Sequence, residues 1–180
     1  MKKNISREIK IPEGVQVELN GKEIVVKAEG KELKRKFDIP NVEISVDSGI
    51  VKLNAEKATK REGKLMGTSA AHIKNMLDGI KENYVYKLEV CSVHFPMNVK
   101  AEEGKVVIKS FLGEKQDRIS RIPKNVKVDV KGNQIEVSSY DKEAAGQTAA
   151  NLEKATRLKG RDRRIFQDGI YITEKPGRAI

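Results

Sequence analysis

The sequence contains no tryptophan and only four tyrosines and four phenylalanines among its 180 residues. Proteins that bind single-stranded nucleic acid by stacking its bases rely on aromatic side chains, so this composition argues against that mode of binding. Cysteine is scarce as well. Cys91 is the only one, which excludes an internal disulfide and fits a reducing compartment.

Long apolar runs are also missing. No segment approaches the roughly 20 apolar residues that a membrane-spanning helix needs. The start of the chain, Met1-Lys2-Lys3-Asn4, leads into polar sequence without the apolar core of a signal peptide. We therefore expect a cytoplasmic protein with no membrane partner.

Metal-binding and nucleophilic side chains are sparse. Cys91 and His94 lie three residues apart, but the only other cysteine or histidine is His72, and a zinc site needs three or four ligands. Residues three apart in a strand also point to opposite faces, which argues against a Cys–His nucleophile pair. We expect a buried thiol, a structural histidine and no metal.

Motifs for cofactors and catalysis are equally weak. The segment Glu62–Thr68 contains Gly-Lys, but it lacks the first glycine of a P-loop and the Ser or Thr after the lysine. Glu102-Glu103 flank an expected hairpin turn, and Asp168-Gly169 is expected as a turn before the last strand. We expect no enzymatic activity, no cofactor and no small-molecule substrate.

Positive charge, by contrast, is plentiful. Lys and Arg total 36 against 26 Asp and Glu, a net charge of +10, which favours a polyanionic partner. Arginine donates two parallel hydrogen bonds to phosphate oxygens, and the C-terminal part of the chain is rich in it. An RNA contact is expected there; the alternative is a solvated basic loop and tail. The candidate residues are Lys154, Arg157, Lys159, Gly160, Arg161, Arg163, Arg164, Lys175 and Arg178.

Three smaller groups of basic residues leave the choice between RNA contact and a solvated face open. One lies within Lys31–Lys36 and one within Lys57–Lys64. The third consists of Lys2, Lys3, Arg7 and Lys10, expected as a basic N-terminal arm. Phe166 and Tyr171, beside the C-terminal cluster, are expected in the core.

The chain carries an internal duplication with a period of about 80 residues, too long for a solenoid repeat. In the first half the matching apolar, Pro and Gly positions are Ile11, Pro12, Val15, Val17, Gly21, Ile24, Val25, Val26, Ile39, Pro40, Val42, Ile44, Val46, Val51, Leu53, Gly67, Ala70 and Ala71. In the second half they are Phe95, Pro96, Val99, Ala101, Gly104, Val106, Val107, Ile108, Ile122, Pro123, Val126, Val128, Val130, Ile135, Val137, Gly146, Ala149 and Ala150.

Each half predicts the same elements. Alternating apolar residues indicate strands buried on one face, and turns such as Asn20-Gly21, Asp47-Ser48-Gly49 and Lys131-Gly132-Asn133 predict antiparallel hairpins. Apolar residues spaced by three and four then predict one helix per half, and Asp141 is expected to cap the second. The stripes are Met66, Ala70, Ile73, Leu77 and Ile80 in the first helix, and Ala145, Ala149, Leu152 and Ala155 in the second.

The predicted fold class is therefore α+β, with two tandem homologous domains, each an antiparallel sheet packed against one helix. We expect a first domain over residues 1–82, including the basic N-terminal arm, and a second over 83–180, including a basic C-terminal extension. The strand pattern at Tyr84–Val90 by itself fits either side of this boundary.

Four segments carry a family resemblance. Together they are similar to the sixth large-subunit ribosomal protein family, in its archaeal and eukaryotic branch, and the similarity spans nearly the whole chain. The segments are Tyr84–Pro96, Phe111–Lys115, Asp141–Gln147 and Arg161–Tyr171.

This resemblance implies a structural constituent of the large ribosomal subunit. It implies binding to 23S-type rRNA near the stalk base and the sarcin–ricin region, beside neighbouring ribosomal proteins. Much of the RNA contact would come from the second domain and its C-terminal extension, which here covers Lys154–Arg178. The Arg161–Tyr171 segment takes the place of the Lys-Gly-Lys-Gly loop of bacterial members.

Two other classes of function remain open on the residues alone. One is an RNA-binding module or translation regulator outside the ribosome. The other is a protein–protein adaptor that uses exposed sheet edges rather than the basic C-terminal region.

Overall fold

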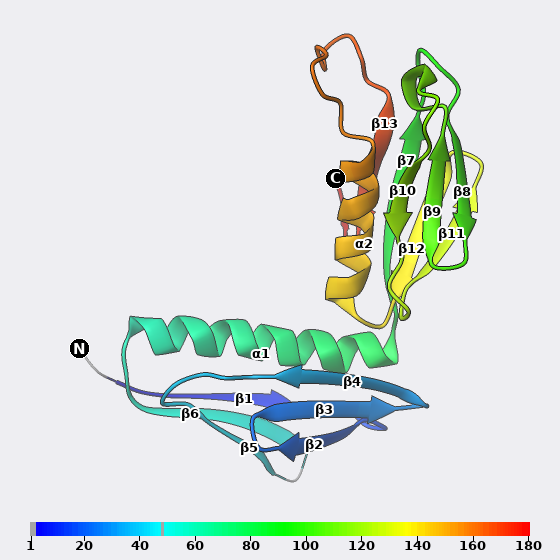
Figure 1. Cartoon of the computed structure of the whole chain (residues 1–180). Helices are drawn as coiled ribbons and strands as arrows, with labels where there is room; N and C mark the ends of the chain where they lie inside the picture. The colour runs from blue at the N-terminus through cyan, green and yellow to red at the C-terminus, as the bar shows by residue number, and fades with distance from the viewer. Residues whose placement is uncertain (1–2, 48) are drawn as a thin grey trace. The chain divides into compact units, whose positions relative to one another are not determined.

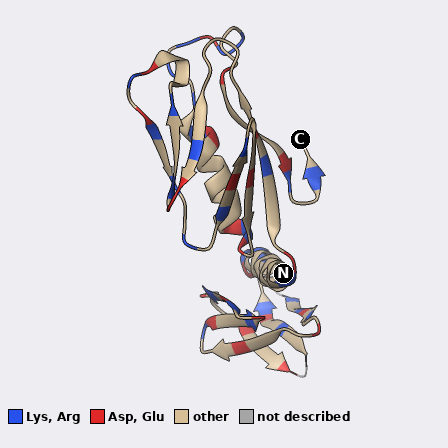
Figure 2. Cartoon of the chain, turned by 90° about the vertical axis from the view of Figure 1, so that its right-hand side faces the viewer, with Lys and Arg blue, Asp and Glu red and all other residues tan. Residues whose placement is uncertain are grey.

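The chain folds as two compact units, Met1–Glu82 and Asn83–Ile180. The computed structural model describes residues 3–47 and 49–180. Lys2, expected in a basic arm, and Ser48, expected in a turn, lie outside the described residues. Charges of both signs follow the strands of each unit (Figure 2), so the net charge by itself does not single out one face.

Residues 3–47 and 49–82 of the first unit form two three-stranded antiparallel sheets and one helix (Figure 1). The strand orders are β1-β6-β5 and β2-β3-β4, and the helix contacts strands of both sheets. The bounds are β1 Lys3–Lys10, β2 Gln16–Asn20, β3 Glu23–Ala28, β4 Lys31–Lys36, β5 Glu43–Asp47, β6 Ile50–Ala58 and α1 Lys60–Lys81.

The N-terminal basic residues belong to the first sheet. Lys3, Arg7 and Lys10 were expected in an arm, but they lie in β1, which pairs with β6 from Lys3 to Lys10. Side chains alternate between two faces along β1. Ile5, Arg7 and Ile9 share the face toward α1, where Ile5 and Ile9 are half-buried, and Glu8 and Lys10 point to the other face. This alternation, which is typical of a strand with one buried face, explains why the segment does not project as an arm.

Helix α1 begins at a capping box. The side chain of Thr59 accepts a hydrogen bond from the backbone N–H of Arg61, and the Glu62 carboxylate accepts from the backbone N–H of Thr59 at 2.8 Å. Such reciprocal caps satisfy backbone donors that have no partner within the helix. The predicted apolar stripe is confirmed: Met66, Ile73, Leu77 and Ile80 are buried, and Ala70 is partly buried.

The second unit has the same plan with an addition at its C-terminal end. Its sheets have the orders β10-β9-β8 and β11-β12-β7-β13-β14, and α2 contacts strands of both. The bounds are β7 Tyr84–Cys91, β8 Asn98–Glu102, β9 Lys105–Lys109, the 3-10 turn η1 Phe111–Gly113, β10 Arg118–Arg121, β11 Lys127–Lys131, β12 Gln134–Ser139, α2 Lys142–Ala155, β13 Gly169–Lys175 and β14 Arg178–Ala179.

The duplication is visible in the strand order. The order β5-β6-β1 of the first unit reappears as β11-β12-β7, and β4-β3-β2 reappears as β10-β9-β8. All pairings are antiparallel, with left-handed glycines such as Gly21 (φ 64°) and Gly132 (φ 60°) in the hairpin turns. The predicted α+β class and internal duplication are confirmed. The structure adds that each unit divides its strands between two sheets, where one had been expected.

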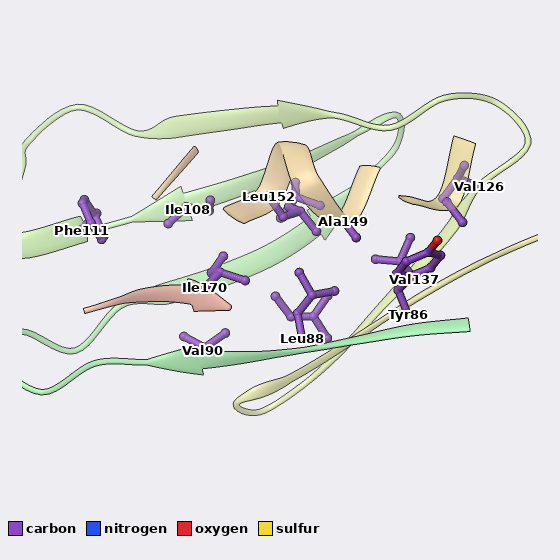
Figure 3. Close-up of a cluster of buried hydrophobic side chains, with 13 residues drawn as sticks. Tyr86, Leu88, Val90, Ile108, Phe111, Val126, Val137, Ala149, Leu152 and Ile170 are labelled. Atoms are coloured by element: carbon purple, nitrogen blue, oxygen red, sulfur yellow. The ribbon is translucent and has the colours of Figure 1, made fainter. Parts of the chain in front are cut away.

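The core of the second unit lies between α2 and its sheets (Figure 3). Ala149 and Leu152 from α2 belong to the same buried cluster as Leu88 from β7 and Ile170 from β13. Asp141 caps α2 as predicted, because its carboxylate accepts the backbone N–H of Glu143 at 2.9 Å. The helix is therefore fixed at its N-terminus, and its C-terminal end leads directly into the basic C-terminal cluster.

Candidate nucleic-acid interface

The basic C-terminal cluster is largely one loop. Residues 157–168 connect α2 to β13 and form the basic loop, which extends past the end of α2 in Figure 1 before returning to β13. Gly160 has a φ of 66°, a left-handed conformation that favours glycine, and it turns the chain within the loop. The exposed basic side chains of the loop are Arg157, Lys159, Arg161, Arg163 and Arg164.

Thr156 closes the base of the basic loop. Its backbone ends α2, and its buried hydroxyl donates to the carbonyl oxygen of Glu153 at 3.2 Å. The same hydroxyl accepts the backbone N–H of Ile170, in β13, at 2.9 Å. Because Ile170 is fully buried, this hydrogen bond joins both ends of the loop to the core.

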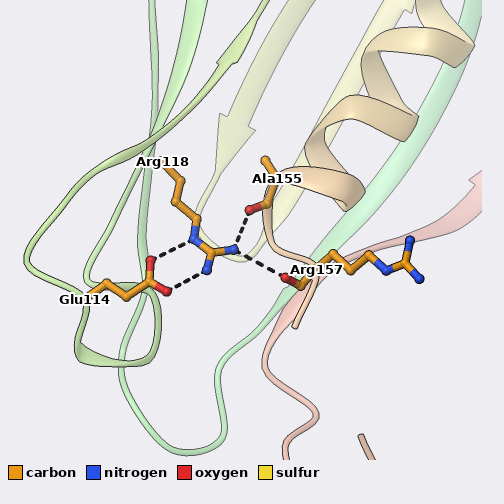
Figure 4. Close-up of polar contacts among 4 residues, drawn as sticks. All are labelled: Glu114, Arg118, Ala155 and Arg157. Atoms are coloured by element: carbon orange, nitrogen blue, oxygen red, sulfur yellow. Dashed lines mark hydrogen bonds and ion pairs between the residues drawn. The ribbon is translucent and has the colours of Figure 1, made fainter. Parts of the chain in front are cut away.

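Arg118, from β10, holds the first residues of the basic loop (Figure 4). Its Nη1 donates to the carbonyl oxygens of Ala155 at 2.7 Å and of Arg157 at 3.5 Å. Ala155 is the last residue of α2 and Arg157 lies two residues beyond it. At a helix C-terminus backbone acceptors lack partners within the helix and a positive charge is favourable.

A second set of contacts orients the Arg118 guanidinium. Nε and Nη2 donate to the two carboxylate oxygens of Glu114 at 2.8 and 2.6 Å, and the guanidinium lies 4.2 Å from the ring centre of Phe111. The hydrogen bond from Arg118 holds the pKa of the Glu114 carboxyl below its usual value. The segment Phe111–Glu114 is thereby connected to the start of the basic loop.

Asp168 holds the other end of the basic loop. Its carboxylate is buried and accepts the backbone N–H groups of Val93 at 2.8 Å and of His94 at 2.9 Å, while His94 Nδ1 lies 2.7 Å from Oδ2. Burial raises the pKa of the carboxyl, but the hydrogen bonds from His94 and Val93 outweigh burial and lower the pKa overall. A buried carboxylate with three donors fixes both segments that it joins.

An aromatic stack continues from His94 into the basic loop. The His94 and Phe166 rings lie 4.7 Å apart at 31°, and the guanidinium of Arg161 lies 4.8 Å from the ring centre of Phe166. Phe166 was expected in the core, but it is only half-buried and lies in the basic loop rather than a strand. Its ring therefore supports the basic side chain of Arg161.

The basic side chains of the loop differ in whether they already form an ion pair within the protein. Arg164 forms a bidentate ion pair with Asp162, with Nε at 3.1 Å and Nη2 at 2.8 Å from its carboxylate. Arg163 and Arg157 instead line a pocket of about 320 Å³ together with Lys154 and Tyr171. Tyr171 is thus half-buried beside this pocket rather than deep in the core, as had been expected. Cations around a shallow pocket can bind phosphate oxygens.

Two of the predicted site residues lie elsewhere. Lys175 and Arg178 face each other across the β13–β14 hairpin, whereas the basic loop joins the other end of β13 at Gly169. Gly169 and Lys175 are six positions apart along β13, or roughly 20 Å. The structure therefore brings Lys154 and the loop residues together and leaves Lys175 and Arg178 as a separate basic pair.

The residues that hold the basic loop were missed from the sequence. Arg118, His94 and Asp168 are distant from one another in the chain, and the sequence pattern of Asp168-Gly169 indicated only a turn. Strand β7 ends at Cys91, so the expectation that Cys91 and His94 lie on opposite faces of one strand did not apply.

The contacts of Cys91 and His94 do not indicate a metal site or a nucleophile pair. His94 pairs with Asp168, and burial raises the pKa of the half-buried Cys91 thiol, which keeps it protonated and weakly nucleophilic. Among residues 3–47 and 49–180, no group of three or more His, Cys, Asp or Glu side chains could hold a metal ion.

Comparison with known proteins identifies the family. The sequence model of the family Ribosomal protein L6 matches residues 11–83 and again residues 95–169. The chain belongs to the ribosomal protein L6 family. The two matches correspond to the two units of the structure and confirm the resemblance found in the sequence. Proteins of this family are structural and not enzymatic.

Archaeal relatives match along nearly the whole chain. The large ribosomal subunit protein uL6 of Methanococcus vannielii is 46% identical over 176 residues, covering 98% of this chain and 97% of its own. The protein of the same name from Methanobrevibacter smithii is 44% identical over 171 residues, covering 95% and 96%. That of Methanosarcina mazei is 45% identical over 175 residues, covering 97% and 99%. Within the part of the chain that the structure describes, neither helix is long and apolar enough to cross a membrane.

Proposed function

We propose that this protein is a structural constituent of the large ribosomal subunit and binds its rRNA through the basic loop. The observation that carries the proposal is the basic loop itself. It presents exposed basic side chains while Arg118, Thr156 and Asp168 fix its ends. A rigid basic surface suits structured RNA, which is recognised largely through its shape, phosphates and 2′-hydroxyls.

The pocket residues are the main phosphate ligands in this proposal. Lys154, Arg157 and Arg163 surround one concavity, so a single phosphate or two adjacent phosphates can be bound by several donors. Lys159, Gly160, Arg161 and Arg164 extend the contact along the basic loop. Lys175 and Arg178 form a second contact at the far end of β13. Fixing the loop before binding lowers the entropy cost of ordering these side chains.

The location within the subunit is inferred from the family. We infer that the protein binds 23S-type rRNA near the stalk base and the sarcin–ricin region, in the cytoplasm, beside neighbouring ribosomal proteins. Membership of the ribosomal protein L6 family along 11–83 and 95–169 supports this location. In this position the protein braces folded RNA segments against one another, for which no nucleophile or cofactor is needed.

The test is ultraviolet crosslinking of the protein within purified large subunits, followed by sequencing of the attached RNA. We expect the crosslinked peptide to include residues 154–166 and the RNA to come from the sarcin–ricin region or the stalk base. Crosslinks confined to the first unit, or to RNA from another part of the subunit, would contradict the proposal.

An RNA-binding module or translation regulator outside the ribosome is the alternative. Sedimentation after a salt wash separates the two. A subunit constituent stays with the large-subunit peak, whereas a regulator is released from it and appears in the light fractions. Recovery of most of the cellular protein in light fractions would favour the alternative.

A further inference from the structure

The duplicated units provide an internal comparison of their edge strands. Arg7 in β1 lies opposite Leu53, and Tyr86 in β7 lies opposite Val137; Leu53 and Val137 are matching positions of the repeat. The glycines of the helices give the same alignment. A side chain added at Gly67 would meet Arg7, and one added at Gly146 would meet Tyr86. Strand β1 is therefore the counterpart of β7, with Ile9 in the position of Leu88.

The two counterparts differ at their outer edge. In the second unit β13 pairs antiparallel with that edge of β7, with Ile172 opposite Leu88 and Ile170 opposite Val90. In the first unit β1 ends its sheet, and no strand within residues 3–47 or 49–82 covers it. The described part of the first unit therefore has no counterpart of β13, the strand that completes the corresponding sheet of the second unit.

A groove marks the place of the missing strand. It has a volume of about 580 Å³ and lies between β1 and α1. Its apolar lining is Ile9, Pro12, Ala70, Ala71 and Leu77, and charged residues such as Arg7, Lys74 and Asp78 line it as well. The matching space in the second unit is filled, because Ile170 and Ala149 are fully buried together.

The residues of the first unit that match the buried core of the second remain partly exposed to solvent. Ile9 and Ala70 are only partly buried, whereas their counterparts Leu88 and Ala149 are 1% and 0% exposed. The small side chains on α1 leave room for an added strand to bring apolar side chains of its own.

The backbone of β1 is oriented to pair outward. The N–H of Ile11 donates to the carbonyl oxygen of Gly49, on the β6 side. Backbone groups alternate in direction along an antiparallel strand, so those of Ile9 also face β6 and those of Glu8 and Lys10 face outward. In the second unit the N–H of Val90, the counterpart of Ile11, likewise donates to the carbonyl oxygen of Asn133, on the β12 side. The other edge of β7 pairs with β13.

We propose that the outer edge of β1 binds an extended segment of another protein as an additional antiparallel strand. The exposed backbone groups give the pairing, and the groove takes an apolar side chain opposite Ile9. For its charges to complement those of β1, the added strand needs an acidic residue opposite Lys10 and a basic residue opposite Glu8. In the second unit the corresponding contact is the 2.7 Å ion pair of Lys87 with Glu174.

Other occupants fit this edge less well. A second copy of β1, paired antiparallel about Ile9, would match the charges of Glu8 and Lys10, but it would place the charged Arg7 opposite Ile11 on the face of the strand that carries Ile9. RNA would leave the apolar groove unfilled. The strand-binding site is independent of RNA binding by the basic loop, so failure of one leaves the other standing.

The test uses the full-length protein and a fluorescent peptide of residues 168–175 carrying Tyr171→Glu and Glu174→Lys, which supplies the required charges. We expect saturable binding by anisotropy and slower amide exchange at Glu8 and Lys10. Glu8→Pro removes one outward N–H and none of the β6 hydrogen bonds, so we expect it to weaken binding about tenfold or more. Glu8→Ala keeps the N–H, and we expect a change of about twofold.

Ala70→Leu, which fills the groove without touching the backbone, provides a second variant; we expect it also to weaken binding by about tenfold. Thermal melting checks that each variant is folded. No binding of the peptide at millimolar concentration, or equal binding to wild type and to folded Glu8→Pro and Ala70→Leu proteins, would overturn the proposal. So would dimerisation of the protein through this edge in sedimentation velocity, abolished by Glu8→Pro, because the occupant would then be a second copy.

Discussion

Arg118 connects the carboxylate of Glu114 to the backbone carbonyl of Ala155, the last residue of α2, with distances of 2.6 and 2.7 Å from its terminal nitrogens. The Arg118 side chain is 27% exposed, so water screens this contact only partly. One side chain thus neutralises an acidic residue, completes the end of a helix and holds the first residue of the basic loop.

Replacing Arg118 is expected to loosen the basic loop without removing any of its charges. For Arg118→Gln we expect the free energy of unfolding to fall by about 1–3 kcal/mol, because carbonyl acceptors and a carboxylate are left without their donor. Trypsin is expected to cleave within residues 157–164 faster than in wild type. The matched control is Arg121→Gln on the same strand, which is expected to change stability by less than about 0.5 kcal/mol. Equal effects of the two substitutions would contradict this role.

The Asp168 contact predicts a dependence of stability on pH. The pKa of this carboxyl is lowered from 3.8 in the folded protein, so the unfolded chain binds the proton more readily. The stabilisation is therefore fully present above about pH 4 to 5 and disappears as the pH falls through the folded pKa. Asp168→Asn is expected to be less stable than wild type at pH 6, with the difference shrinking below pH 4.

Asp162→Asn is the control for that titration. The pKa of Asp162 is also lowered, chiefly by its hydrogen bond from Arg164, but this ion pair is exposed, and exposed pairs contribute little to stability. Urea denaturation between pH 3 and 6 measures both variants. A larger decrease of stability in Asp162→Asn than in Asp168→Asn would show that the buried contact does not hold the basic loop.

The matching glycines of the two helices predict opposite responses. A Cβ at Gly146 would lie 2.9 Å from the hydroxyl oxygen of Tyr86, a buried side chain, whereas one at Gly67 would lie no closer than 3.5 Å to Arg7. Gly67→Ala is expected to raise stability by about 0.5–1 kcal/mol, since alanine favours the helix. Gly146→Ala is expected to lower it because the Tyr86 ring must shift. Thermal melting of the two variants tests this; stabilisation by both would refute the close contact.

Neighbouring arginines of the basic loop are expected to differ in RNA binding. Arg164 is paired with Asp162, whereas Arg163 faces the pocket with Lys154 and Arg157. We therefore expect Arg163→Gln to weaken RNA affinity by a larger factor than Arg164→Gln, although each removes one charge. Filter binding at one salt concentration decides between them. Equal decreases would mean that RNA opens the Arg164–Asp162 pair.

Local patterns in the sequence predict a large part of the fold. The duplication, the hairpins, the stripe from Met66 to Ile80 and the Asp141 cap all depend on residues close together in the chain, or on repetition. The division into two sheets does not follow, because strand periodicity does not specify which strands pair. Strand β1 resembles a basic arm in sequence, because the charged Arg7 lies between Ile5 and Ile9 on the inner face and interrupts the apolar alternation.

The basic residues of the site can be predicted from the sequence, but the contacts that hold the basic loop in place cannot. Arginines, lysines and a glycine within a short segment indicate a basic loop directly. The contacts that hold the loop join residues far apart in the chain, such as His94 and Asp168, 74 positions apart, or Arg118 and Ala155. A single sequence gives no signal for such pairs, so the pattern at Asp168 indicates only a turn.

The most direct test of RNA binding through the basic loop is affinity for transcribed large-subunit rRNA, measured at several salt concentrations. The rRNA of Methanococcus vannielii is suitable, because its uL6 protein is 46% identical to this chain. The loop variant carries Arg157→Gln, Lys159→Gln and Arg163→Gln. The control removes the same charge from the first unit through Lys31→Gln, Lys34→Gln and Lys36→Gln. Circular dichroism and melting temperature confirm that both are folded.

The loop variant is expected to bind more weakly than wild type. It is also expected to flatten the plot of log affinity against log salt by about 0.7–0.9 for each phosphate that the protein no longer neutralises, or roughly 2 to 3 in total. The control variant is expected to stay close to wild type in both affinity and slope. Wild-type affinity and slope in the loop variant, together with a decrease of both in the control, would place the RNA-binding surface on the first unit and contradict RNA binding through the basic loop.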